Sequence, residues 1–386
     1  MSDGMPALQL LAPDGTFSAK GAAEELVPYI DALDDATLRG FYRDMSLTRA
    51  FDVEATNLQR QGEMALWVPS RGQEAAQVGS ARAARAQDHL FPSYREHAAA
   101  MVRGVDPLDI VRMLRGLTHG GWDPATHGNF HIYTLVIGSH VLHATGYAMG
   151  VLFDNELRDA AVKPVGKGTK AGTSTSADDN EAVIAYFGDG ATSQGDVAEA
   201  FVFAASYQTP QLFFIQNNHW AISVPVSTQS RTPLYLRGTG YGIPSVQIDG
   251  NDVLVSYAAS KRALDAARSG AGPHLIEALT YRMGAHTTSD DPTKYRPKSE
   301  EESWAKRDPI SRYETWLRSR GADDAFFGEV EAEAGDLAAD IRRRTHALDE
   351  PSSDQIFDHV YSEPHPTLSE QKEWLAQYNE SFGDAS

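Results

Sequence analysis

Two short motifs with oxygen-bearing side chains each follow an apolar run of the kind that forms a buried strand. Gly188-Asp189-Gly190 follows residues 181–187, and Asn217-Asn218 follows residues 211–216. The carboxyl ends of neighbouring parallel strands border the same ligand crevice, so Asp189 and Asn218 are expected to meet there. Carboxylate and amide oxygens suit Mg²⁺, which usually also contacts substrate phosphates. The two motifs therefore predict a Mg²⁺-diphosphate site.

The pair of motifs is more specific than either member alone. Gly188-Asp189-Gly190 by itself would be an ordinary turn, and Asn217-Asn218 an ordinary strand end. The chain contains no GxxxxGK[ST] loop, and Gly188-Asp189-Gly190 is not part of a GxGxxG fingerprint. The glycines would let the backbone approach a phosphate closely, and the helix expected after them would direct its N–H groups toward it.

The elements that must position these motifs alternate between strand and helix patterns. Helical patterns occupy residues 191–207 and 252–268, and the alternation predicts an α/β fold with a parallel sheet flanked by helices. We expect an N-terminal arm at 1–36, an α/β domain at 37–330 with a flexible surface loop at 161–180, and a helical C-terminal extension at 331–386. The expected strands are 181–188, 211–217, 245–249 and 273–283.

Composition excludes several classes of protein. The net charge of −19 argues against a nucleic-acid or anionic-membrane binder, and the absence of cysteine excludes disulfides and thiolate metal sites. The N-terminus has no signal-peptide pattern, so a cytoplasmic location is expected. Residues 133–153 carry no formal charge and are long enough to span a bilayer, but His140, His143 and Ser139 favour a buried segment of the α/β core.

The two motifs together resemble the thiamine-diphosphate motif of thiamine-dependent enzymes. More narrowly, the chain from about residue 37 to 380 is similar to the α chain of the decarboxylating first component of 2-oxoacid dehydrogenase complexes. This resemblance implies a thiamine-diphosphate-binding fold. Further matching segments are 92–97, His131, 188–196, 217–223, 240–244, 249–253, 281–291 and 356–361.

The resemblance also implies a role for each matching residue. Mg²⁺ would be bound by the side chains of Asp189 and Asn218 and by the backbone carbonyl of Trp220. His286 would lie beside the reacting thiazolium carbon. Gln216 stands where some relatives have a phosphate-binding arginine, so it departs from the pattern. The residues that would contact the cofactor are Tyr94, Arg95, Ser139, Val141, Gly188, Asp189, Gly190, Ala191, Asn218, Arg282 and His286.

The histidines allow two interpretations. An unperturbed imidazole titrates near neutral pH, which suits His286 to proton transfer, and His131 is a second catalytic candidate. His131 matches the pyruvate-type enzymes, whereas His127 could be matched to the branched-chain type. The histidines at 119, 127, 131, 140 and 143 are also dense enough to raise a zinc site as the alternative, although HExxH and cysteine are absent.

As a member of this family, the chain would catalyse the oxidative decarboxylation of a small 2-oxo acid with acyl transfer to a lipoyl group. A branched-chain 2-oxo acid is favoured, with pyruvate next. The resemblance implies a β subunit as partner, in a complex of two α and two β chains, and a lipoyl-bearing acyltransferase core. The alternatives are an acetoin dehydrogenase α subunit and a non-catalytic scaffold with a decayed cofactor site.

Overall fold

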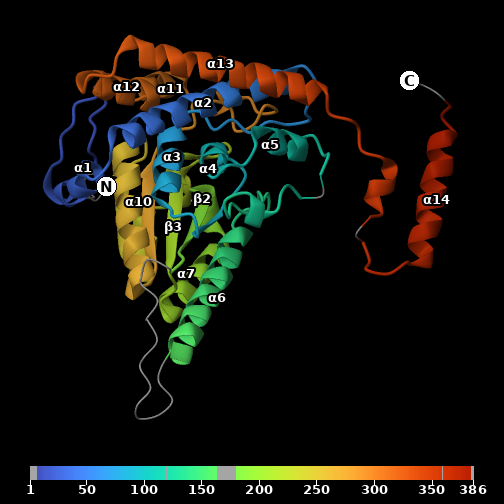
Figure 1. Cartoon of the computed structure of the whole chain (residues 1–386), viewed down its shortest axis with the longest axis horizontal. Coiled ribbons are helices and arrows are strands. Elements are labelled where there is room, and N and C mark those ends of the chain that lie inside the picture. The colour runs from blue at the N-terminus through green and yellow to red at the C-terminus, as the bar shows by residue number, and fades with distance from the viewer. Residues whose placement is uncertain (1–6, 119, 163–179, 359, 384–386) are drawn as a thin grey trace.

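A parallel β-sheet of five strands lies at the centre of the chain. The computed structural model describes residues 7–118, 120–162, 180–358 and 360–383. The strand order is β1-β2-β3-β7-β6, and all four pairings are parallel. Helices cover both faces of the sheet, as Figure 1 shows. The fold class predicted from the sequence is therefore confirmed.

The elements have the following bounds. The strands are β1 (His89–Phe91), β2 (Val183–Gly188), β3 (Gln211–Asn217), β4 (Trp220–Ala221), β5 (Val224–Pro225), β6 (Ser245–Asp249) and β7 (His274–Leu279). The helices are α1 (Val27–Asp31), α2 (Asp35–Arg60), α3 (Glu74–Ala83), α4 (His97–Val102), α5 (Pro107–Leu114), α6 (Ser139–Val162), α7 (Gly195–Tyr207), α8 (Val226–Gln229), α9 (Tyr235–Gly240), α10 (Val253–Ala266), α11 (Lys298–Ala305), α12 (Pro309–Ser319), α13 (Asp324–His346) and α14 (Pro366–Glu380).

The two faces of the sheet build two hydrophobic cores, because successive side chains of a strand point to opposite faces. On β2, Ile184 and Tyr186 belong to the core beneath α2, α3 and α10. Ala185 and Phe187 belong to the core beneath α6 and α7. Both faces are buried, and this explains why these strands are apolar throughout rather than alternating.

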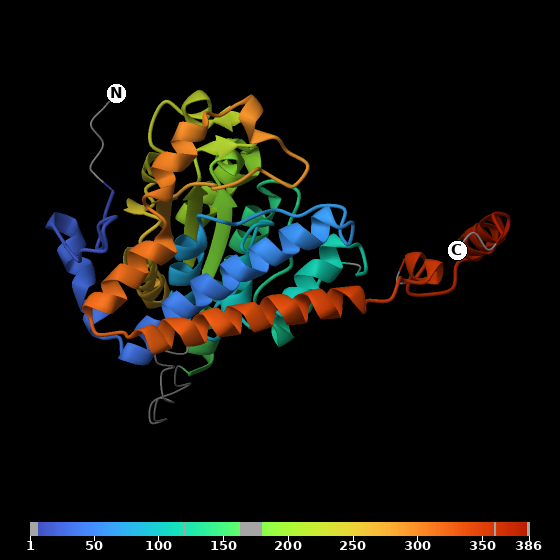
Figure 2. The same cartoon turned by 90° about the horizontal axis from the view of Figure 1, so that it is seen from above.

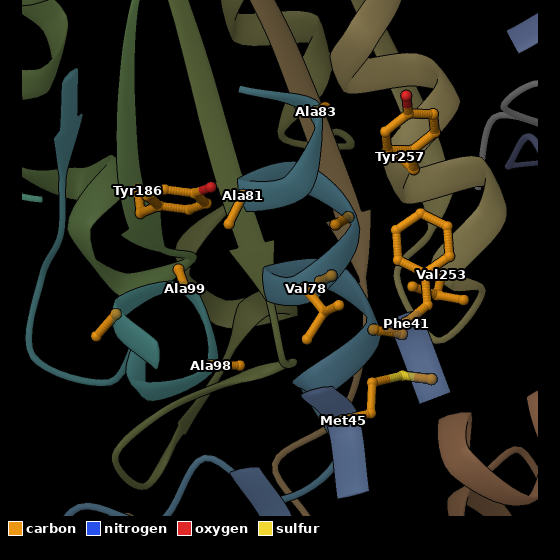
Figure 3. Close-up of a cluster of buried hydrophobic side chains, with 14 of the residues drawn as sticks. Phe41, Met45, Val78, Ala81, Ala83, Ala98, Ala99, Tyr186, Val253 and Tyr257 are labelled. Atoms are coloured by element: carbon orange, nitrogen blue, oxygen red, sulfur yellow. The ribbon is translucent and has the colours of Figure 1, made fainter. Parts of the chain in front are cut away.

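Helices α3 and α10 approach each other closely on the first face. A Cβ atom on Gly79 would lie 2.7 Å from both the Cβ of Ser256 and the carbonyl oxygen of Val253. Figure 3 shows Phe41, Val253 and Tyr257 on the α10 side of α3, and Tyr186 on the other side, where it points from the sheet toward α3. The Tyr186 hydroxyl lies 2.9 Å from the Ser80 hydroxyl, so its polar end is satisfied inside the core.

Both ends of the chain run along the outside of this body. Leu8 forms a parallel bridge to Ile248, which covers part of the edge strand β6. Helix α13 packs along α2, whereas α14 stands away from the body in both views (Figure 1, Figure 2). The expected boundary at 330/331 falls inside α13. The division into arm, domain and extension otherwise stays a prediction.

Three local expectations were wrong or incomplete. Residues 133–153 are not buried throughout, because α6 buries Val141 and Ala148 and exposes Tyr147 on its opposite face. The short edge strand β1 was missed, because three residues carry no readable periodicity. Most of the loop expected at 161–180 lies outside the described residues, and its first two positions belong to α6.

No helix within the described ranges has the length and apolar character needed to cross a membrane.

The N-terminal arm depends on one buried carboxylate, which provides a test of the fold. Asp252 accepts hydrogen bonds from the backbone N–H groups of Leu10 and Leu11, both at 2.7 Å, and caps α10 through Leu254 at 3.0 Å. We expect Asp252→Ala to lower the free energy of unfolding by roughly 3 kcal/mol, because a cap and buried charged hydrogen bonds are lost together. Chemical denaturation measures this. Asp34→Ala removes only the exposed cap of α2 and should cost less; equal losses would contradict the role of Asp252 in anchoring the arm.

Candidate active site

A pocket of about 210 Å³ opens at the carboxyl ends of the parallel strands. Most of its lining comes from the segments that follow β1, β2, β3 and β7, because parallel strands all end at the same edge. The side chains predicted from the sequence to bind a diphosphate thus meet in one place. The pocket is lined by Gln73, Ser93, Tyr94, Arg95, Glu96, Ile137, Gly188, Asp189, Gly190, Ala191, Gln216, Asn218, Trp220, Ala221, Ile222, Arg282 and His286.

Two buried arginines face this pocket. Arg282 is fully buried and Arg95 is 6% exposed. Arg282 donates to the backbone carbonyls of Trp220 at 3.0 Å and Ile222 at 2.9 Å, and Arg95 donates to the carbonyl of His286 at 3.0 Å. Within the described ranges neither guanidinium has a carboxylate partner, and the Nε of Arg282 has no acceptor. The pocket therefore presents two guanidinium groups that form no ion pair in the described structure, which favours an anion.

His286 lies between the two arginines. Its Nδ1 is 3.1 Å from Arg95 Nη2 and 3.3 Å from Arg282 Nη1, so Nδ1 acts as an acceptor and the ring proton belongs on Nε2. Burial, together with the positive charges of Arg95 and Arg282, lowers the pKa of His286 to about 3. The pKa of this imidazole is thus well below the unperturbed value, and the ring is neutral near pH 7.

The loop after β7 is held over the pocket by hydrogen bonds. Asp290 accepts from the backbone N–H of His286 at 2.7 Å and from the hydroxyl of Tyr295 at 2.5 Å. Tyr295 in turn accepts from Arg282 at 2.9 Å. A second tie joins Thr288 to Trp67, whose backbone N–H donates to the Thr288 hydroxyl at 3.0 Å. These contacts fix the ring of His286 relative to both arginines.

Asp189 and Asn218 follow the neighbouring strands β2 and β3, line the same pocket and are both buried. The carboxylate of Asp189 accepts from Gln229 at 3.3 Å, and burial raises the pKa of Asp189 to about 6. A buried carboxylate with so few donors is stabilised by a bound cation. Gly190 is required beside it, because a Cβ there would lie 2.7 Å from the Cβ of Ala221.

Two details of this wall differ from expectation. The helix expected directly after Gly190 is preceded by a 3₁₀ turn, η4 (Gly190–Ser193), and α7 begins only at Gly195. The N–H groups of Gly190 and Ala191 therefore belong to the turn. The carbonyl of Trp220, predicted to face a metal ion, accepts a hydrogen bond from Arg282.

Three predicted site residues do not line the pocket. Ser139 begins α6 and donates from its hydroxyl to the carbonyl of Val136 at 2.9 Å. Val141 is fully buried in the core beneath α6 and α7. His131 stacks on Phe91, with ring centroids 3.7 Å apart. These positions were assigned by resemblance in a segment without clear motifs. A misalignment of a few residues there cannot be detected from the sequence.

Other pocket residues were not assigned a role from the sequence. Ile137, two positions before Ser139, provides an apolar wall. Ile222 also lines the pocket and has a φ of 55°, a strained backbone conformation for a β-branched residue. Glu96 is buried, and burial raises its pKa to about 7. The unusual φ of Ile222 could not have been predicted from the sequence. Glu96 could have been singled out, because it lies inside the matching segment 92–97.

The remaining histidines are spread over separate environments. His131 Nε2 lies 3.1 Å from His89 Nδ1, and burial lowers the pKa of both histidines to about 4. His140 contacts the carbonyl of Tyr186 at 2.6 Å, and His127 contacts the carbonyl of Asp123 at 2.9 Å. His119 lies outside the described residues. In the part of the chain that is described, no three His, Cys, Asp or Glu side chains are arranged to hold a metal ion, so the zinc alternative has no support here.

Comparison with known proteins shows a consistent set of relatives. The model of the family "Dehydrogenase E1 component" matches residues 42–341. The chain is 42% identical over 377 residues to the 3-methyl-2-oxobutanoate dehydrogenase subunit alpha of Mycobacterium tuberculosis, covering 97% of this chain and 95% of the relative. It is 39% identical over 356 residues to the pyruvate dehydrogenase E1 component subunit alpha of Acholeplasma laidlawii (90% and 95% covered), and 34% identical over 354 residues to that of Staphylococcus aureus (91% and 88%).

The position of His286 between two arginines leads to a testable titration. Its pKa in the folded chain is below its ordinary value, so the imidazole should stay neutral from pH 8 down to below pH 5. Arg95→Gln removes one of the two positive charges and should move the pKa of His286 upward, toward the ordinary value. Nuclear magnetic resonance of the histidine ring measures both. Arg39→Gln changes a distant arginine and should leave the titration unchanged; a wild-type midpoint near pH 6.5 would contradict the assignment.

Proposed function

The chain belongs to the family of the dehydrogenase E1 component, and from this we propose that it is the α subunit of a 2-oxoacid dehydrogenase that uses thiamine diphosphate and Mg²⁺. Its activity is the oxidative decarboxylation of a 2-oxo acid, with a lipoyl group as acyl acceptor. A branched-chain 2-oxo acid is the proposed substrate, because the relative at 42% identity carries a branched-chain name and the pyruvate-type relatives are at 39% and 34%.

The observation that carries this proposal is the pair of buried arginines without carboxylate partners within the described structure. Two like charges buried in one pocket are costly unless an anion binds there. A diphosphate fits this requirement, since its oxygens can accept from Arg95, Arg282 and the N–H groups of Gly190 and Ala191. Tyr94 lies at the same wall and would donate its hydroxyl.

The residues around Asp189 fit a magnesium ion. Its buried carboxylate, the Asn218 amide oxygen and the Trp220 carbonyl are all oxygen ligands of the kind Mg²⁺ takes, with phosphate oxygens completing the set. The Trp220 carbonyl can do this while it accepts from Arg282, because a carbonyl oxygen has two lone pairs. Ser139 and Val141 do not line the pocket, so Ile137 is the better candidate for contact with the rest of the cofactor.

When bound, thiamine diphosphate supplies the centre at which a 2-oxo acid loses CO₂. The residues of this chain bind and orient it. His286 would present its Nε2–H to the reacting end, as a hydrogen-bond donor to a substrate carboxylate or carbonyl. A bound diphosphate would offset the charges of Arg95 and Arg282, and this would raise the pKa of His286 toward the range useful for proton transfer. We still propose His131 as a second catalytic residue, although it does not line the pocket.

We propose a β subunit as the obligatory partner, with two α and two β chains per complex, and a lipoyl-bearing acyltransferase core as the next partner. Support comes from the apolar side chains that α6 and α7 leave exposed. They are Tyr147, Phe153, Leu157, Val202, Phe203 and Tyr207. Such a patch is typical of a subunit interface. The cytoplasmic location expected from the sequence stays a prediction.

The proposed metal site predicts a specific loss in Asp189→Asn. The amide keeps the shape but not the charge, so Mg²⁺-dependent binding of thiamine diphosphate to the assembled α and β chains should weaken by at least roughly a hundredfold. Isothermal titration calorimetry measures this. In the wild type the affinity should also fall as the pH drops below about 6, because Asp189 then takes up a proton. Glu199→Gln, an exposed change on α7, is the control; unchanged Mg²⁺ dependence in Asp189→Asn would reject the metal site.

The proposed partnership predicts that the α chain alone is inactive. Purified α chain should show no decarboxylation of any 2-oxo acid, whereas the α and β chains together should. A panel of 3-methyl-2-oxobutanoate, pyruvate and acetoin then identifies the substrate by kcat/KM, with the branched-chain acid expected to lead. Full activity of the α chain alone would refute the partnership. Preference for acetoin would reject the proposed substrate class.

A further inference from the structure

Three buried side chains form a hydrogen-bonded row directly behind Arg95. Gln216, near the end of β3, donates from Nε2 to Glu96 Oε1 at 2.6 Å and accepts at Oε1 from Gln77 Nε2 at 2.9 Å. Gln77 is fully buried on α3, Glu96 is 1% exposed and Gln216 is 2% exposed. The row joins α3, β3 and the segment after β1.

Both outer members of this row bind the main chain of Arg95. Its backbone N–H donates to Glu96 Oε2 at 3.1 Å, and its carbonyl accepts from Gln77 Nε2 at 3.1 Å. The peptide groups on either side of Arg95 are thus fixed. The carboxylate of Glu96 is occupied with the backbone rather than with the guanidinium, so the guanidinium keeps its donors for the pocket.

We propose that Glu96 is a positioning residue for the diphosphate end of the site, acting with Gln216 and Gln77 through the main chain of Arg95. This inference rests on the proposed function. It also assigns a role to Gln216, which stands where some relatives have a phosphate-binding arginine. Here the Gln216 amide faces Glu96 and Gln77, and it serves Arg95 indirectly rather than contacting the cofactor.

The need for such a row follows from the charges in the pocket. Arg95 and Arg282 repel one another, and the described carbonyl acceptors of Arg95 belong to loops rather than to strands. Without the row, the main chain of Arg95 would have more freedom, and the repulsion would displace the guanidinium before an anion binds. Fixing the backbone of Arg95 from a strand and a helix lowers the entropy lost when the diphosphate is bound.

Because each hydrogen bond in the row has a defined donor and acceptor, the side chains at positions 96 and 216 can be exchanged as a test. Glu96→Gln places an amide NH₂ either against the Gln216 NH₂ or against the Arg95 N–H, so one contact is lost. Gln216→Glu places two carboxylates against each other and raises the pKa of one. In the double variant Glu96→Gln/Gln216→Glu, the new amide donates to the new carboxylate, and the contacts from Arg95 N–H and Gln77 are both kept.

The assembled α and β chains would be titrated with thiamine diphosphate and Mg²⁺ by calorimetry at pH 8. Each single variant should bind roughly tenfold more weakly, the size of one lost hydrogen bond to a charged group, and the double variant should return to within about threefold of the wild type.

A control separates positioning from general destabilisation. Gln211 is fully buried at the opposite end of the same strand β3. Gln211→Glu should therefore lower the unfolding temperature without changing the affinity for thiamine diphosphate. Unchanged affinity in both single variants, or a double variant that binds no better than they do, would overturn the inference. A wild-type complex that does not bind thiamine diphosphate would instead overturn the proposed function itself.

Discussion

Mutual repulsion between Arg95 and Arg282, both buried at one edge of the sheet, is the constraint around which the site is organised. Neither guanidinium forms an ion pair in the described structure, and each is held by backbone carbonyls. A carbonyl dipole offsets positive charge only partly, so an anion between the arginines gains more than it would near paired ones. The neutral state of His286 follows from the same charges.

Rigid elements of the fold surround the two arginines and hold them in place despite their repulsion. The sheet is covered on both faces, and α3 reaches α10 closely enough that Gly79 has no room for a Cβ. Arg282 also holds the small β4–β5 hairpin through two carbonyls, including that of the strained residue Ile222. Strain of this kind persists only where neighbouring contacts enforce it. The same arginine thus joins the proposed anion site to the hairpin beside the proposed metal site.

The row of Gln77, Gln216 and Glu96 adds a second layer to this organisation. Its members come from a helix, a strand and a loop, and they converge on the backbone of one residue. The glutamine at position 216, where some relatives have an arginine, is therefore explained by its contacts with Glu96 and Gln77. On the outer side, α6 and α7 leave apolar side chains exposed, and we propose this face as part of the contact with a β subunit.

The sequence by itself determined the fold class, the strands that carry Asp189 and Asn218, and the resemblance that identified Arg95, Arg282 and His286, because apolar runs and short motifs are local. Only the tertiary structure decided what depends on contacts between distant segments. It lowered the pKa of His286, which a lone histidine in a sequence does not reveal, and it buried Val141 in the core while bringing Ile137 to the pocket. Ile137 lies four positions before Val141, and no local pattern in that segment fixes which of its residues reaches the pocket.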